Sequence, residues 1–158
     1  MRTSPGALLL AAALVSLGAV ATALVTQHVF GMQPCPWCVL QRVIFVAIGA
    51  AALVAWLLRW RWTRRVGALL VLALAGCGVA AALWQHFVAA ASASCNLTLA
   101  DRIVNGLGLD GLWPEVFAAY ASCADAAAKL AGVPYEFYSL TLFVLLGAIA
   151  VLVLRRPL

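Results

Sequence analysis

The chain has 158 residues, of which 66% are hydrophobic and 9% charged, and its mean hydropathy is +1.08. This composition is typical of a protein whose surface lies mostly in lipid, and it excludes an ordinary water-soluble domain. The formal net charge of +5 does not indicate a nucleic-acid partner, because the basic residues gather at the ends of apolar segments.

Four stretches are long and apolar enough to cross a bilayer, since a spanning helix needs about 20 mostly apolar residues. They are expected at residues 7–26, 39–58, 66–88 and 137–154. The remaining segments leave no room for a soluble domain, so residues 1–158 are predicted to form a single integral-membrane domain. The predicted fold class is an all-α membrane protein, a four-transmembrane-helix bundle with a short first and a long second exported loop.

The first apolar segment allows a second interpretation. Arg2 precedes it, and the small-residue pattern Ala19-Val20-Ala21 resembles the cleavage site of a signal peptide. The apolar run is about 20 residues long, whereas the apolar region of a signal peptide has roughly 7–15 residues. Its length therefore favours an uncleaved first helix.

The basic residues predict the orientation of the bundle. Seven of the ten lie at three places that four helices put on one side: Arg2; Arg59, Arg61, Arg64 and Arg65; Arg155 and Arg156. By the positive-inside rule this side is the cytoplasm, where both termini are expected. Segments 27–38 and 89–136 are then exported, and the second carries all five acidic residues. We expect a multi-pass protein of the cell inner membrane with periplasmic loops.

Four of the five cysteines fall in these exported loops, where disulfides persist: Cys35, Cys38, Cys95 and Cys123. Of the three possible pairings, Cys35 with Cys38 is the most local choice, which leaves Cys95 for Cys123. The small ring closed by the first pair suits redox cycling. The second pair closes a long loop, and bracing that loop is an alternative role for it. Cys77 stands alone within a helix, as a packing residue.

A short helix is expected to begin near Pro114 in the second exported loop. Apolar residues there are spaced to line one helical face: Leu112, Trp113, Val116, Phe117 and Tyr120. We expect this helix to lie along the membrane surface, with Trp113 and Tyr120 at headgroup level. A plain cover over the mouth of the bundle is the alternative role.

Cys38 is predicted to be the more acidic thiol of its pair. It lies at a helix N-terminus, where free backbone N–H groups and the helix dipole favour a thiolate. Arg42 lies one turn further on the same helical face, and its positive charge favours the anion as well. Haem attachment requires a histidine where Val39 stands, and His28 and His86 match no zinc-finger spacing, so no metal site is predicted.

Arg42 is the one charge within the predicted spans, and an ionisable group there marks a functional site by default. It either snorkels to the interface or donates a hydrogen bond to a carbonyl in the lipid as that carbonyl is reduced. His86, at the outer end of the third predicted helix, lies at a similar depth. It is a candidate proton donor to the reduced acceptor, with an ordinary interfacial histidine as the alternative.

Over nearly its whole length, the chain resembles the DsbB family of disulfide-bond-formation proteins. The resemblance is carried by Gln27-His28-Val29, Pro34-Cys35-Pro36-Trp37-Cys38, Gln41-Arg42, His86, Cys95, Trp113-Pro114-Glu115-Val116-Phe117 and Cys123-Ala124. It implies a four-helix, monomeric thiol oxidase that oxidises a soluble periplasmic thioredoxin-like protein, DsbA, and reduces ubiquinone or menaquinone.

The resemblance also implies roles for single residues. The position of Cys95 forms the mixed disulfide with the partner, and the electrons then pass to Cys35 and Cys38. Cys38 contacts the quinone, with Arg42 and His86 beside it. The bulky Trp37, next to Cys38, departs from the family pattern and is expected to alter access to the Cys35–Cys38 bond.

Two alternative functions remain, a related oxidoreductase and a protein of another class. A membrane oxidoreductase of the vitamin K epoxide reductase type also has four helices and a Cys-x-x-Cys pair, but that pair is expected near a later helix. A non-enzymatic membrane module would use its disulfides only as braces. Bracing explains neither Arg42 nor the short Cys35–Cys38 ring.

Overall fold

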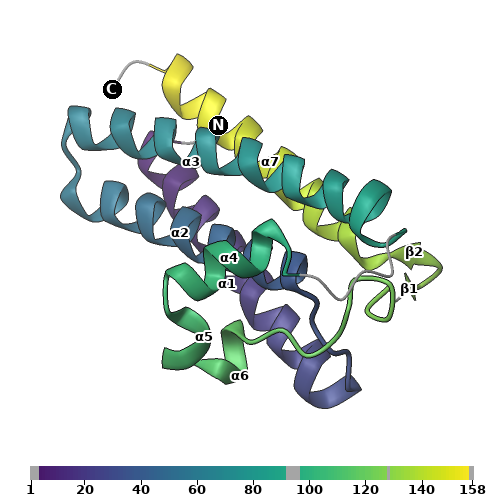
Figure 1. Ribbon diagram of the computed structural model, residues 1–158. Helices are drawn as coiled ribbons and strands as arrows, with labels where there is room; N and C mark the ends of the chain where they lie inside the picture. The colour runs from purple at the N-terminus through teal and green to yellow at the C-terminus, as the bar shows by residue number, and fades with distance from the viewer. Residues whose placement is uncertain (1–3, 92–96, 128, 157–158) are drawn as a thin grey trace.

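The computed structural model describes residues 4–91, 97–127 and 129–156, so Cys95 lies outside the described residues. Four long helices form the bundle: α1 (Pro5–Phe30), α2 (Pro36–Leu58), α3 (Arg61–Trp84) and α7 (Tyr135–Arg155). Each is long and apolar enough to cross a membrane. α2 packs between α1 and α3, and α7 packs mainly on α3 (Figure 1). The predicted all-α, four-helix fold class is confirmed.

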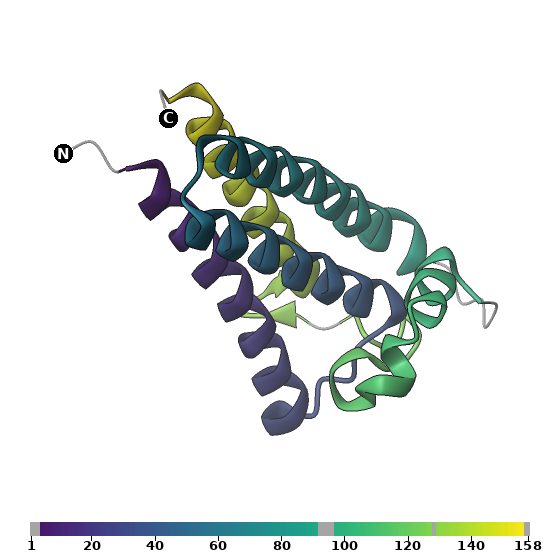
Figure 2. The ribbon, with the colours of Figure 1, turned by 90° about the vertical axis from the view of Figure 1, so that its left-hand side faces the viewer.

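The two ends of the bundle differ in character. The described ends of the chain and the α2–α3 turn lie at one end, and the second loop lies at the other (Figure 2). That loop contains α4 (Leu99–Gly106), α5 (Leu109–Leu112), α6 (Pro114–Phe117) and a hairpin of β1 (Lys129–Leu130) and β2 (Val133–Pro134). α6 begins at Pro114 but ends at Phe117, so Tyr120 lies beyond it. The loop therefore folds over the mouth of the bundle as several short elements.

α1 and α2 extend beyond the ranges predicted from hydropathy, and capping residues mark where they begin and end. Ser4 accepts a hydrogen bond from the backbone of Ala7 at the start of α1, and Gly31 ends that helix with φ 68°. At the start of α2, the sulfur of Cys35 accepts a hydrogen bond from the backbone N–H of Cys38, 3.3 Å away. Cys38 thus lies in the first turn of α2, close to the free N–H groups of the helix end.

The third span ends in a turn that is wider than a regular α turn. After Trp84 the backbone hydrogen bonds change from the α to the π pattern, in η1 (Gln85–Ala89). The helix continues through this change, and α3 and η1 together form one span over Arg61–Ala89. Single π turns within helices occur often at functional sites, because the wider turn redirects successive side chains. Here the turn carries Gln85 and His86.

Gly67 marks the closest approach of α2 and α3. A Cβ at this position would collide with the Cβ of Ala55 and lie 3.3 Å from the carbonyl oxygen of Ala51. We expect Gly67→Ala to separate the helices and lower the free energy of unfolding by about 1–3 kcal/mol, the usual cost of overpacking. Unfolding in detergent, followed by circular dichroism, measures this change. Gly76→Ala in the same helix is the control, because nothing lies within 4 Å of the added methyl group.

Candidate functional site

Cys35 and Cys38 lie together at the N-terminal end of α2. The sulfur atoms of Cys35 and Cys38 are 2.8 Å apart, close enough for one thiol to hydrogen-bond to the other. Cys35 is fully buried and Cys38 is partly exposed. The pair expected from the Cys-x-x-Cys spacing is therefore positioned for thiol–disulfide chemistry.

The second loop brings a third cysteine to this pair. The backbone N–H groups of Tyr120 and Ala121 donate to the carbonyl oxygen of Pro34, at 3.0 and 3.4 Å. This contact joins the two loops and places the thiol of Cys123 within hydrogen-bonding distance of Cys35. The expected Cys95–Cys123 bond stays a prediction, because Cys95 is outside the described residues.

Within the three-cysteine cluster, the pKa values of Cys35 and Cys123 move in opposite directions. Hydrogen bonds with Cys123 and then Cys38, together with burial, raise the pKa of Cys35 far above its ordinary value. The hydrogen bond with Cys35 lowers the pKa of Cys123, helped by the backbone N–H of Trp37 and opposed by burial. Cys123 is thus the better nucleophile, and Cys35 retains its proton as a thiol.

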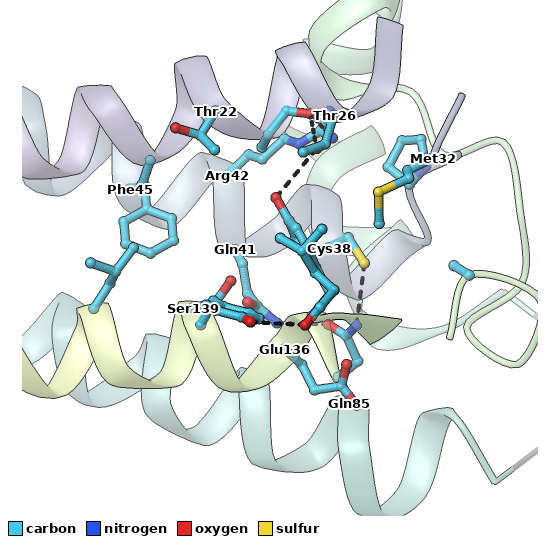
Figure 3. Close-up of a pocket in the computed structure, with 18 of the residues that line it drawn as sticks. Thr22, Thr26, Met32, Cys38, Gln41, Arg42, Phe45, Gln85, Glu136 and Ser139 are labelled. Carbon is cyan, nitrogen blue, oxygen red and sulfur yellow. Dashed lines mark hydrogen bonds between the residues drawn. The ribbon is translucent and has the colours of Figure 1, made fainter. Parts of the chain in front are cut away.

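One glutamine donates a hydrogen bond to the sulfur of Cys38, and a second glutamine orients the first. The side chain of Gln85, in η1, donates from Nε2 to the sulfur at 3.2 Å (Figure 3). Its Oε1 accepts a hydrogen bond from Nε2 of Gln41 at 2.7 Å, which fixes the orientation of the amide. Neither glutamine was among the predicted site residues. In the sequence, each directly precedes a candidate, Arg42 or His86, and Gln41 is also part of a motif that carries the family resemblance.

Arg42 is 6% exposed, so its guanidinium is buried within the protein. Its Nη1 donates to Oε1 of Gln27 at 2.6 Å and to the carbonyl oxygen of Val116 at 3.0 Å, and its Nη2 donates to the carbonyl of Ala23 at 3.4 Å. Its acceptors among the described residues are thus neutral oxygens of α1 and α6. A buried guanidinium with neutral partners leaves positive charge available to a ligand.

A cavity of about 350 Å³ opens beside Cys38 and Arg42 (Figure 3). Its apolar wall includes Val15, Ala19, Phe45 and Leu142, and its polar wall includes Thr22, Thr26, Gln41, Gln85, Glu136 and Ser139. Among the described residues, Cys38 is the only cysteine that lines it. A mostly apolar cavity with a few convergent polar groups suits a ring-shaped ligand with carbonyl oxygens.

His86 is not among the residues that line this cavity, although it was predicted to lie beside the acceptor. Its Nδ1 is 2.7 Å from Oε1 of Glu136, and Glu136 does line the cavity. Glu136 was expected at the end of the exported loop, but it lies in the first turn of α7. The sequence signal for this contact is weak, since only tertiary packing pairs residues 50 positions apart.

Comparison with known proteins identifies the family. A family model described as disulfide bond formation protein DsbB matches residues 5–153. The chain belongs to the DsbB family. Relatives called disulfide bond formation protein B include one from Ralstonia nicotianae, 33% identical over 99% of this chain and 98% of the relative, and one from Cupriavidus necator, 34% identical over 99% and 97%. A third, from Herminiimonas arsenicoxydans, is 35% identical over 88% of each chain.

Membership in the DsbB family confirms the predicted resemblance and sets aside the vitamin K epoxide reductase type. The chain is therefore a multi-pass inner-membrane protein and a disulfide oxidoreductase that takes part in disulfide bond formation. A module whose disulfides serve only as braces does not agree with this assignment.

In this DsbB-family chain we expect Gln85→Leu to lower the reactivity of Cys38. A hydrogen bond to a charged group contributes about 1.5–3 kcal/mol, so its loss is expected to reduce the thiolate population roughly 10- to 100-fold. The rate of Cys38 alkylation in the reduced protein, followed by mass spectrometry across pH, measures this effect. Asn105→Leu, at an exposed amide of α4 that does not line the cavity, is the control, and equal rates in both variants would contradict the role of Gln85.

Proposed function

We propose that the chain is a protein-thiol oxidase that reoxidises a periplasmic thioredoxin-like dithiol protein of the DsbA kind and passes the electrons to a membrane quinone. The observation that supports this most directly is the order of the sulfur atoms. Cys123 lies against Cys35, Cys35 lies against Cys38, and Cys38 lines the cavity among the membrane helices.

The first exchange takes place in the second loop. A thiolate of the partner attacks Cys95 in a Cys95–Cys123 disulfide, forming a mixed disulfide and releasing Cys123 as a thiolate. The lowered pKa of Cys123 makes it a good leaving group and keeps it ionised for the next step. The partner's second thiolate then attacks the mixed disulfide, which releases the oxidised partner and Cys95.

The second exchange joins the loops. The Cys123 thiolate attacks Cys35 in a Cys35–Cys38 disulfide, so a Cys123–Cys35 bond forms and Cys38 leaves as a thiolate. Cys95 then attacks Cys123 and restores the second-loop disulfide, and Cys35 takes up a proton. The raised pKa of Cys35 agrees with this outcome, in which the negative charge remains on Cys38.

The residues around the cavity fit a quinone ring, whether of ubiquinone or menaquinone. When bound, a quinone accepts two electrons and two protons. Arg42 and Gln41 offer N–H donors for its oxygens, while Phe45 and Leu142 offer apolar contact for the ring. The guanidinium of Arg42 would stabilise negative charge that develops in the cavity.

We propose that the protein is a monomer. Its proposed orientation puts the second loop in the periplasm and both termini in the cytoplasm. It is supported by the α2–α3 turn and the C-terminal end of α7, which carry arginines and lie at the end of the bundle away from the second loop (Figure 2). Leu112→Cys places a thiol at an exposed residue of α5, and its labelling by a membrane-impermeant maleimide in intact spheroplasts tests this orientation. We expect labelling without permeabilisation, and labelling only after permeabilisation would reverse the orientation.

Stopped-flow mixing tests the complete reaction. Purified protein is mixed with a reduced thioredoxin-like protein and with soluble analogues of each quinone, and quinol formation is followed by absorbance. We expect one quinol for each partner disulfide formed. Partner oxidation without quinol formation, or quinol formation without the partner, would reject the proposed electron path.

A further inference from the structure

We infer that Glu136 donates a proton to the electron acceptor in the cavity, and that His86 returns a proton to Glu136 from the outer surface. This inference rests on the proposed function and adds a route for protons to its route for electrons. Glu136 lies in the first turn of α7 and lines the same cavity as Cys38 (Figure 3).

The pair bridges the interior and the exterior of the bundle. The side chain of Glu136 is 8% exposed, whereas that of His86 is 32% exposed. Their 2.7 Å contact is short enough for a proton to pass between Oε1 and Nδ1. The ring of His86 is held between Phe87 and Phe137, with ring centroids 4.9 and 4.7 Å away. The buried carboxyl thus reaches the outside through one fixed imidazole.

The proton balance of the reaction requires such a route. When the Cys35–Cys38 disulfide forms again, the two cysteines give up two electrons, and the Cys35 thiol gives up one proton. Cys38 reacts as a thiolate and has no proton to give. Reduction of a quinone to a quinol needs two protons, and Cys35 does not line the cavity, so at least one proton has to enter the cavity from water. Glu136 supplies it, and His86 takes up its replacement.

The other titratable groups of the cavity are already engaged. Arg42 keeps its charge throughout and donates to Gln27 and Val116. Among the tyrosines that line the cavity, the hydroxyl of Tyr135 lies 3.4 Å from Oγ1 of Thr26, and that of Tyr138 donates to the carbonyl oxygen of Leu130 at 2.8 Å. Glu136 is the group here with a proton-exchanging partner that reaches the surface.

Glu136→Gln tests the inference, because the amide retains the shape and hydrogen-bonding capacity of the carboxyl but carries no acidic proton. We expect quinol formation in a single turnover to slow by about 10²-fold or more, the usual contribution of a positioned general acid. His86→Gln is expected to slow it less. Glu115→Gln, at an exposed carboxylate of α6, is the matched control with an unchanged rate. Equal rates in Glu136→Gln and Glu115→Gln would overturn the inference.

A second measurement needs no quinone. Chemical reduction of the cysteines changes the charge in the cavity that Cys38 and Glu136 both line. The infrared difference spectrum between oxidised and reduced protein is expected to show a carboxyl band that Glu136→Gln removes and Glu115→Gln retains. A spectrum without such a band, or one unchanged in Glu136→Gln, would also overturn the inference.

A separate measurement on the same variants tests the proposed function independently of the proton route. Transfer of the disulfide from the quinone-free protein to the reduced thioredoxin-like protein is expected to proceed equally in all of them, since the side chain of Glu136 bonds to His86 and to no cysteine of the described part of the chain. Loss of this transfer in the unsubstituted protein would refute the thiol oxidase function. Normal transfer with normal quinol formation in Glu136→Gln would refute the proton route alone.

Discussion

Cys38→Ala is expected to abolish quinol formation, lowering its rate by about 10³-fold or more, as for loss of an essential nucleophile. The reason is positional: among the described residues, Cys38 is the only cysteine that lines the cavity. Cys35 is buried at the N-cap of α2, outside the set of cavity-lining residues, and its raised pKa keeps it a thiol. Turnover with a reduced thioredoxin-like protein and a soluble quinone, followed by absorbance, measures the loss.

Cys77→Ala is the matched control for this experiment. Cys77 is an exposed residue of α3 and does not line the cavity, so turnover is expected to stay unchanged. The Cys38→Ala variant should also accumulate a disulfide between Cys35 and Cys123 after mild oxidation, because no Cys38 remains to compete. Peptide mapping without reduction detects that bond. Persistent turnover in Cys38→Ala would show that the electrons leave by another sulfur.

Arg42→Leu is expected to lower kcat/KM for the quinone by about 10²-fold, the usual effect of removing one donor that stabilises developing negative charge. Disulfide transfer to the partner without quinone is expected to be less affected. Steady-state kinetics across quinone concentration measures the first quantity, and a single-turnover assay measures the second. Equal losses in both assays would indicate that Arg42 acts by holding the structure together.

The hydrogen bonds of Arg42 make a further control necessary. Its Nη1 joins α2 to Gln27 of α1 and to Val116 of α6, so its removal also loosens the second loop. Gln27→Leu removes the shortest of these contacts and leaves the charge in place. It is expected to cause a smaller loss than Arg42→Leu. A loss as large as that of Arg42→Leu would assign the effect to loop packing instead of charge.

Local sequence patterns account for the bundle and for the centre of the site. Runs of about 20 apolar residues predict four spans because lipid allows few alternatives to a helix. Cys38 and Arg42 lie four residues apart, so the helical period alone places them on one face. The Cys-x-x-Cys spacing likewise brings the sulfur of Cys35 to that of Cys38 without any knowledge of the rest of the fold.

Contacts between distant segments were less predictable. Gln85 reaches Cys38 from 47 residues away, and Glu136 reaches His86 from 50 residues away. Both contacts depend on how α2, α3 and α7 pack, and on a π turn for which we identified no sequence signal. Cys123 lies near Cys35 because backbone N–H groups close to it in the second loop donate to the carbonyl of Pro34. Backbone hydrogen bonds of this kind cannot be predicted from the pattern of side chains. Tertiary packing, and not local propensity, decides these parts of the site.

Two neighbouring residues of the π turn in η1 contact different partners. Gln85 donates to the sulfur of Cys38, and His86 contacts the carboxylate of Glu136. A π turn holds one residue more than a regular α turn, which adds about 100° of rotation and 1.5 Å of rise at this point. Removing one residue between Trp84 and Ala90 is therefore expected to restore a regular α turn, in which Gln85 and His86 could not both keep their present partners. The length of this segment is thus expected to be more restricted than the identity of its exposed residues, such as Phe87.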